Sequence, residues 1–353
     1  MSGRALIVGA TGISGGNLAQ RLLADGWEVA GLCRRPGGLD PRITPLTADL
    51  EDAGAVAAAV RGTTPTHVFF TTWSRRPTEA ENIDVNGRML QNLLDASAEE
   101  KSVRHVALVT GLKHYLGPFE AYATVQPDTP FSEDQPRLPY ENFYYVQEDI
   151  LFAAAERDGF TWSVHRPHTL IGWALGNAMN MGVTLAVYAA ICRETGRSFR
   201  FPGSREQWEA VTDVTDASLL ADHLVWASTT KAAENRALNI VNGDVFRWRR
   251  LWPRLAVALG VEPEPFDGEP QPLEQQMAGA AEIWPEIVRR HGLRDLSVDT
   301  LASWWHTDAD LGRTIETFTD MGQSRRLAFL GVRDTESSFT ELFARLKAER
   351  IVP

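Results

Sequence analysis

The chain has 353 residues, a formal net charge of −11, 44% hydrophobic residues and 23% charged residues. These proportions are typical of a globular protein with a sizeable core, in one large domain or two of roughly 100–200 residues each. The negative charge argues against non-specific binding to nucleic acid or to an anionic membrane surface. The two cysteines, Cys33 and Cys192, provide neither a disulfide framework nor a metal-ligand spacing, so we expect a reducing compartment and no metal.

Two further patterns bear on location. No apolar run reaches the roughly 18–20 residues of a membrane span. The first expected strand begins a few residues after Met1, which leaves no room for a signal peptide. We therefore expect a cytoplasmic protein that binds neither membrane nor nucleic acid.

A glycine-rich turn between a strand and a helix opens the chain. Ala5–Val8 is an apolar run typical of a buried parallel strand, and apolar residues at helical spacing follow from Asn17 to Gly26. A helix that begins here offers free N–H groups and a positive dipole end to a pyrophosphate. The GxxGxxG spacing predicts a dinucleotide site. We expect its contacts to come from Gly9, Thr11, Gly12, Ile13 and Gly15.

The end of the second expected strand, Glu28–Leu32, indicates which dinucleotide binds. In such folds this strand end faces the adenosine ribose, where an acidic residue would bind the 2′-hydroxyl of NAD. Arg34 and Arg35 stand here instead, and guanidinium groups suit the 2′-phosphate of NADP. The alternative is a solvated surface pair. We predict that the cofactor is NADP(H).

The third expected strand, Ile43–Leu46, leads to Asp49 and Leu50. Asp49 could accept a hydrogen bond from the adenine amino group while Leu50 packs on the ring. Alternatively, Asp49 is the N-cap of a helix over Glu51–Arg61, and it could serve as both.

The fourth expected strand, His67–Thr71, ends at Thr72 and Trp73. Ligands in open α/β sheets bind at the carboxyl ends of strands. Trp73 is therefore a candidate wall of the active site, although a buried packing tryptophan is equally compatible with the pattern.

Further alternation predicts the rest of the sheet. A helix over Asn82–Ala96 precedes a strand over Val106–Val109, and a helix that opens near Tyr140 and runs to about Arg157 precedes a strand over Thr161–Arg166. Such alternation predicts an α/β, doubly wound parallel sheet of the Rossmann type.

Beyond Gly172 the alternation weakens. We expect a helix over Asn180–Arg193, short strands over Trp208–Asp213 and Leu238–Val241 around a helix over Ala217–Ala227, and mostly helices after Phe246. The predicted organisation is a Rossmann domain of residues 1–172, completed by 208–243, with a mostly helical substrate-binding cap of residues 173–207 and 244–353.

The catalytic pair departs from the usual short-chain dehydrogenase pattern. Those enzymes place Tyr-x-x-x-Lys on one helix, so that the ammonium lowers the pKa of the phenol. Here Glu148 lies four residues after Tyr144, and Asp149 lies four after Tyr145. Either the chain is inactive or the lysine comes from elsewhere, and Lys113, just past a central strand, is the available substitute.

Several segments together resemble one family. They are GATGISG, CRRP, TTWSRRPTEAEN, TGLKHYLGPFEAY, ENFYYVQEDIL, WSVHRPHTLIGW, VTLAVYAAIC, NGDVFRW and the terminal IVP. The chain is similar to the progesterone 5β-reductase/iridoid synthase-like enzymes, an atypical branch of the extended short-chain dehydrogenases, and is identified as a bacterial-type member. By this resemblance the catalytic lysine is Lys113 and the catalytic tyrosine is Tyr144, the first of the NFYY pair.

The resemblance implies NADPH-dependent reduction of the C=C bond of an α,β-unsaturated ketone or aldehyde. Hydride would attack the β-carbon, and Tyr144 with Lys113 would stabilise the resulting enolate. The remaining implied cofactor contacts are Thr72, Trp73, Thr110, Gly111, Pro167 and Leu170. The implied substrate contacts are Trp73, Phe119, Asn180 and Phe329.

The expected partner is a small hydrophobic enone, and we expect a monomer or a homodimer. Two alternatives stay open. One is a carbonyl reductase or epimerase of the extended short-chain type, and the other is a non-catalytic NADP-sensing protein.

Overall fold

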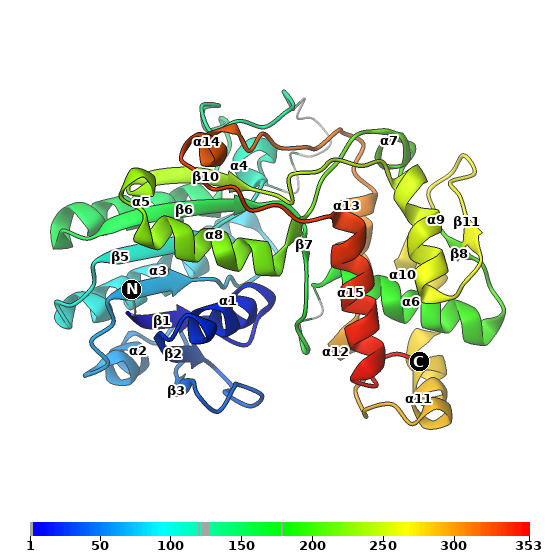
Figure 1. The fold of residues 1–353 in the computed structure, drawn as a ribbon, viewed down its shortest axis with the longest axis horizontal. Helices are drawn as coiled ribbons and strands as arrows, with labels where there is room; N and C mark the ends of the chain where they lie inside the picture. Colours follow the sequence, from blue (N-terminus) through cyan, green and yellow to red (C-terminus); the bar gives the residue numbers. More distant parts are fainter. Residues whose placement is uncertain (1–2, 119–120, 122–126, 178) are drawn as a thin grey trace.

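A seven-stranded parallel sheet organises the amino-terminal part of the computed structural model, which describes residues 3–118, 121, 127–177 and 179–353 (Figure 1). The strand order is β10-β6-β5-β4-β1-β2-β3. It reverses direction between β1 and β4, which is where open α/β sheets bind their ligands. This topology confirms the doubly wound Rossmann prediction. The strands are β1 (Arg4–Val8), β2 (Glu28–Cys33), β3 (Thr44–Thr47), β4 (His67–Phe70), β5 (His105–Val109), β6 (Thr161–Pro167) and β10 (Arg236–Ile240).

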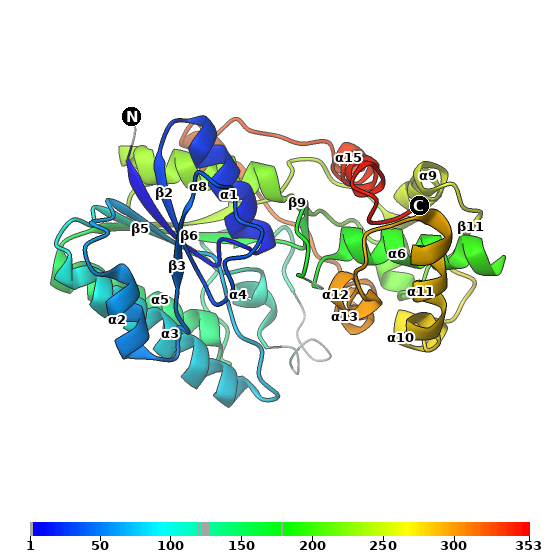
Figure 2. The same cartoon turned by 90° about the horizontal axis from the view of Figure 1, so that it is seen from below.

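Helices cover both faces of the sheet (Figure 2). Side chains alternate along β1, so Ile7 packs in one apolar cluster while Leu6 and Val8 pack in the other. Because both faces are buried, the strands are continuous apolar runs. One face carries α1 (Ile13–Ala24) and α8 (Ala217–Thr229), and the other carries α2 (Ala53–Val60), α3 (Glu79–Glu99) and α5 (Phe143–Asp158).

A second group of helices packs around its own core beside the sheet (Figure 1). Tyr188, Trp252 and Trp284 are fully buried at its centre. Its helices are α6 (Met181–Thr195), α9 (Trp248–Leu259), α10 (Leu273–Gln276), α11 (Ala280–His291), α12 (Val298–Leu301), α13 (Trp304–Leu311) and α15 (Thr335–Ala348). We call this group the cap. Within the described ranges, no helix is both long and apolar enough to cross a bilayer.

Short elements complete these two parts. Two-stranded pairs form between β7 (Leu170–Ile171) and β9 (Thr215–Asp216), and between β8 (Phe199–Arg200) and β11 (Pro263–Glu264). The helical turn α4 (Lys113–Leu116) follows β5, and a 3₁₀ turn, η2 (Lys231–Ala233), precedes β10. Helix α14 (Gly322–Arg326) packs against β10 at the sheet edge, so the chain after residue 244 returns from the cap to the sheet before α15.

Two local predictions are wrong. The stretch expected as a strand over Trp208–Asp213 begins inside a short helix, α7 (Arg205–Glu209), because the side chain of Ser204 accepts a hydrogen bond from the Gln207 amide and caps it. The N-cap of α2 is Asp52, which accepts from the Ala55 amide, whereas Asp49 accepts from the Glu51 amide in the preceding turn.

Candidate active site

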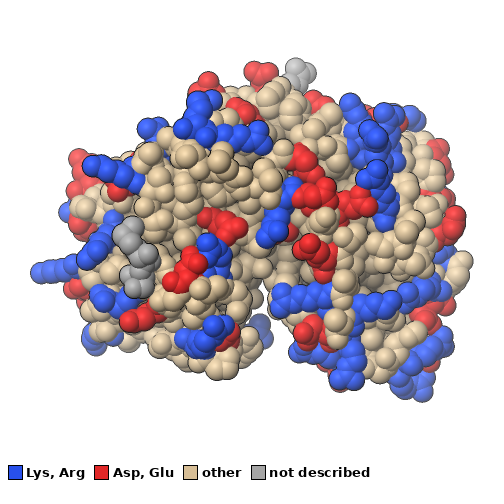
Figure 3. All heavy atoms as spheres, in the orientation of Figure 1, with Lys and Arg blue, Asp and Glu red and all other residues tan. Residues whose placement is uncertain are grey.

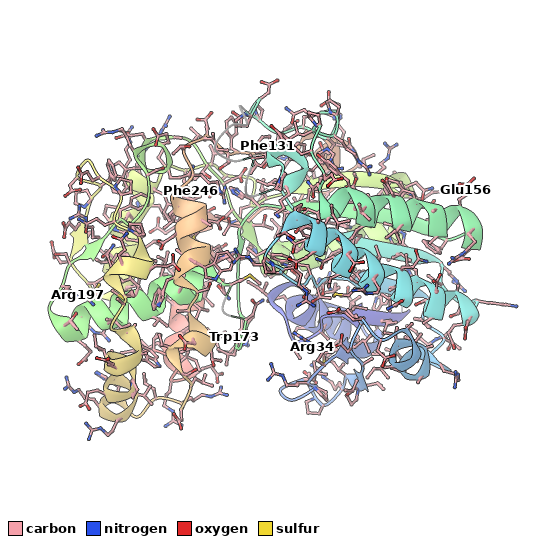
Figure 4. All side chains as sticks on the ribbon, turned by 180° about the vertical axis from the view of Figure 1, so that it is seen from behind. Arg34, Phe131, Glu156, Trp173, Arg197 and Phe246 are labelled. Atoms are coloured by element: carbon pink, nitrogen blue, oxygen red, sulfur yellow. The ribbon has the colours of Figure 1, made fainter. Side chains whose placement is uncertain are left out.

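A cavity of about 660 Å³ lies along the carboxyl ends of the strands, where the sheet meets the cap. Its volume is typical of a site for a cofactor with a small substrate. The space-filling view shows the surface indented between the two parts (Figure 3). Arg34 and Trp173 mark the facing sides of this indentation, on the sheet and the cap respectively (Figure 4). We call this cavity the cleft.

The glycine-rich turn forms one end of the cleft. Gly9 has a φ of +88°, a left-handed conformation that favours glycine. Gly12 is the N-cap of α1 and no side chain caps it, so the N–H groups of the first turn are available to a ligand. Gly9, Thr11, Gly12 and Ile13 all line the cleft. This arrangement fits the pyrophosphate of a dinucleotide.

Gly15 was expected to contact the cofactor, but it does not line the cleft. A Cβ atom at this position would lie 2.7 Å from Thr71 Oγ1 and would run into the Gly9 carbonyl group. The missing side chain therefore allows α1 to pack closely against the turn, and the contribution of Gly15 to a cofactor site is indirect.

The end of the cleft beside β2 carries Arg34, which Arg35 follows in the chain. Both residues are exposed, and Arg34 lines the cleft at the end of β2 whereas Arg35 does not. In the part of the chain that the structure describes, neither guanidinium group forms an ion pair with a carboxylate. Asp49 and Leu50 also line this end. Both arginines are thus available to an anionic group of a bound ligand.

Lys113 is buried at the start of α4, directly after β5. Its Nζ lies 3.5 Å from Glu79 Oε2 and 5.0 Å from the centre of the Phe143 ring. The other carboxylate oxygen of Glu79 accepts a 2.8 Å hydrogen bond from the Phe143 amide. Glu79 was not expected in the site, and it supplies the negative charge that makes a buried ammonium tolerable.

Tyr144 lies in the first turn of α5 and lines the cleft. The side chain of Asn142 caps this helix: its Oδ1 accepts from the Tyr144 amide at 3.0 Å, and its Nδ2 donates to the Lys113 carbonyl group at 2.8 Å. One buried amide therefore fixes the backbones of both candidate catalytic residues. The Tyr144 hydroxyl lies beside Gly111, where an added Cβ atom would be 3.6 Å from it.

Tyr145 faces away from the cleft. Its hydroxyl donates to the His114 carbonyl group at 2.6 Å and accepts from the Leu138 amide at 3.0 Å. Burial raises the pKa of this phenol. Both bonds hold the chain together, so Tyr145 has a structural role and Tyr144 is the tyrosine that faces the cleft.

The other expected cofactor contacts all line the cleft. Trp73 also stacks on Phe143, with ring centroids 5.5 Å apart, so it is both a wall of the site and a packing residue. The residues concerned are Thr72, Trp73, Thr110, Gly111, Pro167 and Leu170.

The expected substrate contacts fit less well. Phe329 lies away from the cleft, buried against His223 and Trp226 of α8 with ring centroids 4.7 Å and 5.2 Å away, because the segment after α14 runs along the sheet. Asn180 is buried as the N-cap of α6, where it accepts from the Val183 amide and donates to the Gly172 carbonyl group. Phe119 lies outside the described residues.

Sequence reasoning did not find the polar wall that the cap contributes. Arg313 pairs with Asp310, and its Nη1 donates to His168 Nε2 at 2.7 Å. His168 Nε2 must therefore accept, which places the ring proton on Nδ1, 2.7 Å from Asp213 Oδ1. Although burial opposes it, Arg313 lowers the pKa of Asp310 to about 2. Asp310 and Arg313 are three residues apart, but no sequence signal indicates that their segment faces the cleft.

Comparisons with known proteins agree with the Rossmann fold and identify a family. Residues 47–353 match the family described as a PRISE-like Rossmann-fold domain. The chain is 42% identical to an (S)-8-oxocitronellyl enol synthase from Nepeta racemosa, over 99% of this chain and 93% of that protein. It is 40% identical to a 3-oxo-Delta(4,5)-steroid 5-beta-reductase from Arabidopsis thaliana, again over 99% and 93%.

Solved structures show the same fold at low identity. The UDP-glucose 4-epimerase of Thermus thermophilus, in complex with NAD, aligns with a TM-score of 0.68 at 16% identity, over 98% of this chain and 99% of that chain. This likeness concerns the fold alone. The comparisons do not support the bacterial origin that the sequence suggested.

Proposed function

The chain belongs to the PRISE-like Rossmann-fold family, and on that premise we propose that it is an NADPH-dependent enone reductase. The substrates would be α,β-unsaturated ketones and aldehydes, reduced at the C=C bond. One relative is named as a 5-beta-reductase of 3-oxo-Delta(4,5) steroids, which is a reaction of this kind. The observation that carries the proposal is the position of the Tyr144 hydroxyl, which lies in the cleft beside Gly111.

The glycine-rich turn supports a dinucleotide cofactor, because its uncapped helix end suits a pyrophosphate. Arg34 and Arg35 support NADPH over NADH, because they are charged donors without carboxylate partners among the described residues. When bound, NADPH would supply the hydride that adds to the β-carbon of the enone.

The residues of the chain would stabilise the charge that this addition creates. Negative charge builds on the carbonyl oxygen, and the Tyr144 hydroxyl can donate a hydrogen bond or a proton to it. The buried ammonium of Lys113 favours this charge electrostatically, and Glu79 holds that ammonium in place. The enolate then takes a proton at its α-carbon, with water as the source.

Product analysis tests the proposal. The protein is incubated with NADPH and a panel of enones and saturated ketones, and the products are identified. A saturated ketone from an enone supports the enone reductase. An alcohol from either substrate would instead favour a carbonyl reductase, and tight NADP binding without turnover would favour a sensing protein.

A further inference from the structure

A second cavity, of about 270 Å³, lies at the opposite edge of the sheet from the cleft. Its lining comes from the end of α3, the start of β5 and the turn between α5 and β6, so it lies where these strands begin, whereas the cleft lies where they end. Figure 4 shows Glu156 near this end of α5, away from Arg34 and Trp173 at the cleft. In the described part of the chain the two cavities share no lining residue. We call the second one the rear cavity.

The lining of the rear cavity changes from apolar to cationic along α3. Leu94 is buried and faces the cavity together with the buried side chains of Val106 and Phe160, whereas Lys101, just after the end of α3, is exposed. The cavity is therefore apolar inside and carries an ammonium group at its mouth. Four of its lining residues have the i, i+3, i+4, i+7 spacing of one helix face, and they are Leu94, Ser97, Ala98 and Lys101.

Ser97 brings a polar group without a partner into this lining. The residue is only 3% exposed, and its hydroxyl forms no hydrogen bond with any residue that the structure describes. A serine inside a helix commonly donates to the carbonyl group one turn earlier, but Ser97 does not. A buried hydroxyl without a partner destabilises the fold. An acceptor on a bound molecule would remove this cost.

Lys101 offers a charge that its surroundings leave unused. The acidic residue that shares the lining, Asp158, already pairs with Arg157. The carboxylate of Glu100 accepts hydrogen bonds from two backbone amides of the loop before β4. Over the described ranges no carboxylate forms an ion pair with the Lys101 ammonium group. This group can therefore attract an anion at the mouth of the cavity.

We propose that the rear cavity binds a small aliphatic monocarboxylate. The hydrocarbon chain packs against Leu94, Val106 and Phe160. The carboxylate accepts a hydrogen bond from the Ser97 hydroxyl and pairs with the Lys101 ammonium group. The volume lies just below the roughly 300–1,000 Å³ of sites for drug-sized ligands, which favours a short chain over a long fatty acid. The site is independent of the proposed reductase function, because it shares no residue with the cleft.

Calorimetric titration of the full chain, with NADPH in excess, tests the ligand class. Octanoate is compared with octan-1-ol, which has the same chain and no charge. We expect the Kd of octanoate to be about tenfold lower, because a hydrogen bond to a charged group is stronger than one to a neutral group. Equal binding of the two would overturn the carboxylate assignment, and no binding of octanoate would overturn the site.

Two substitutions test the polar contacts. Ser97→Ala should raise the Kd for octanoate about tenfold without lowering the thermal stability, because the lost hydroxyl has no partner in the unliganded protein. Lys101→Met should raise it about fivefold at low salt and less at high salt, because the ammonium group is exposed. A Kd that neither substitution changes would overturn the proposal.

Matched controls separate these effects from general ones. Ser228→Ala removes a buried serine hydroxyl of α8 that donates to the Val225 carbonyl group, so it should lower the thermal stability and leave octanoate binding unchanged. Lys231→Met removes an exposed ammonium group of η2, outside both cavities, and should change neither.

A third variant tests the location. Ala98→Leu enlarges a side chain of the lining and should abolish octanoate binding while NADPH affinity stays normal. Thermal unfolding shows whether the variant is folded. If the folded variant still binds octanoate normally, the ligand lies elsewhere, as in the substrate part of the cleft, and the rear cavity is not its site.

Discussion

The hydroxyl of Tyr145 donates a 2.6 Å hydrogen bond to the backbone carbonyl group of His114. It thereby joins the first turn of α5 to α4, the short helix that begins with Lys113. The neighbouring Tyr144 projects into the cleft instead. Successive residues of a helix point about 100° apart, so two adjacent tyrosines can serve such different ends.

The first prediction concerns the cofactor. We expect a preference for NADPH over NADH of at least roughly tenfold, or about 1.4 kcal/mol, because Arg34 lines the cleft at the end of β2, with Arg35 next to it, and a guanidinium group suits a 2′-phosphate. Arg34→Ala should raise the KM for NADPH more than Arg35→Ala, since only Arg34 lines the cleft. The KM for NADH should hardly change in either variant.

Steady-state kinetics with both cofactors makes the measurement. Arg250→Ala is the control, because Arg250 is exposed on α9 of the cap. Equal use of NADPH and NADH by the unmodified protein would refute the assignment of the two arginines.

The sheet could be predicted from sequence because each strand is a short apolar run buried on both faces and bounded by turn residues. Local chemistry also predicts which residues of the glycine-rich turn and the strand ends line the cleft, since both features carry their own signals in the sequence. The prediction of a strand over Trp208–Asp213 was wrong because the apolar residues of this stretch also suit a helix. The side chain of Ser204, the N-cap of α7, favours the helix.

The substrate side of the site could not be predicted in the same way. His306 lies on α13 and Arg313 just after it. Both reach the cleft because α13 packs against α6 and α10, and these contacts join segments that are distant in sequence. Phe329 shows the converse error. It is an aromatic residue in the carboxyl-terminal region expected to bind substrate, but the chain returns along the sheet there and buries Phe329 against α8.

The second prediction tests the packing of the glycine-rich turn. Gly15→Ala should lower the stability by about 1–3 kcal/mol and weaken NADPH binding, because the new methyl group meets the Gly9 carbonyl group and the Thr71 hydroxyl. Gly16→Ala, one position later in the same helix, is the control. A Cβ atom at Gly16 would lie 3.5 Å from its nearest neighbour, the Ala10 carbonyl oxygen, so the methyl group fits. Alanine inside a helix should then raise the free energy of unfolding by about 0.5–1 kcal/mol relative to glycine.

Urea unfolding and NADPH titration of the two variants make the comparison. Two variants of equal stability would mean that α1 shifts to accept the methyl group, and the close approach would then not be a requirement of the site.

The third prediction concerns acid stability, and it rests on a buried chain of hydrogen bonds across the sheet. His105 Nε2 bonds the Ser163 hydroxyl at 2.9 Å, Ser163 bonds His165, His165 bonds His223 at 2.8 Å, and His223 bonds Ser324 at 3.0 Å. Burial lowers the pKa of His105 and His223 to about 3, and that of His165 well below its ordinary value. All three rings are therefore neutral in the folded protein at neutral pH.

In the unfolded chain these histidines titrate near pH 6.5, so below that value the unfolded state binds more protons than the folded state. The folded state therefore has its full stability, as far as these histidines are concerned, above about pH 6.5. The free energy of unfolding decreases as the pH falls from about 6.5 towards 3. Relative to pH 7.5, each of these histidines should lower the free energy of unfolding by about 1.4 kcal/mol at pH 5.5. Burial raises the pKa of Glu133 and of Asp308, which opposes this trend, but His67 and His114 reinforce it because burial lowers their pKa values.

Urea unfolding at pH 7.5 and pH 5.5 measures the difference. A free energy of unfolding that is equal at the two pH values would show that the buried histidines titrate normally.

The last prediction separates the two tyrosines. Tyr144→Phe should lower kcat for enone reduction by about 10²-fold or more, similar to the loss of an oxyanion-hole donor, while NADPH binding survives. Tyr145→Phe should do the opposite. It leaves the His114 carbonyl group and the Leu138 amide without their partner, which should cost about 1–3 kcal/mol of stability while kcat stays near normal.

Lys113→Met should also slow turnover, and together with Tyr144→Phe the effects should be far from additive if the pair acts as one unit. Turnover, NADPH affinity and urea unfolding of the four variants distinguish the possibilities. A Tyr144→Phe enzyme with normal turnover beside an inactive, stable Tyr145→Phe enzyme would reverse the assignment. If both single variants turn over normally, polarisation by a phenol is dispensable, and positioning of a reactive enone against the cofactor supplies most of the rate.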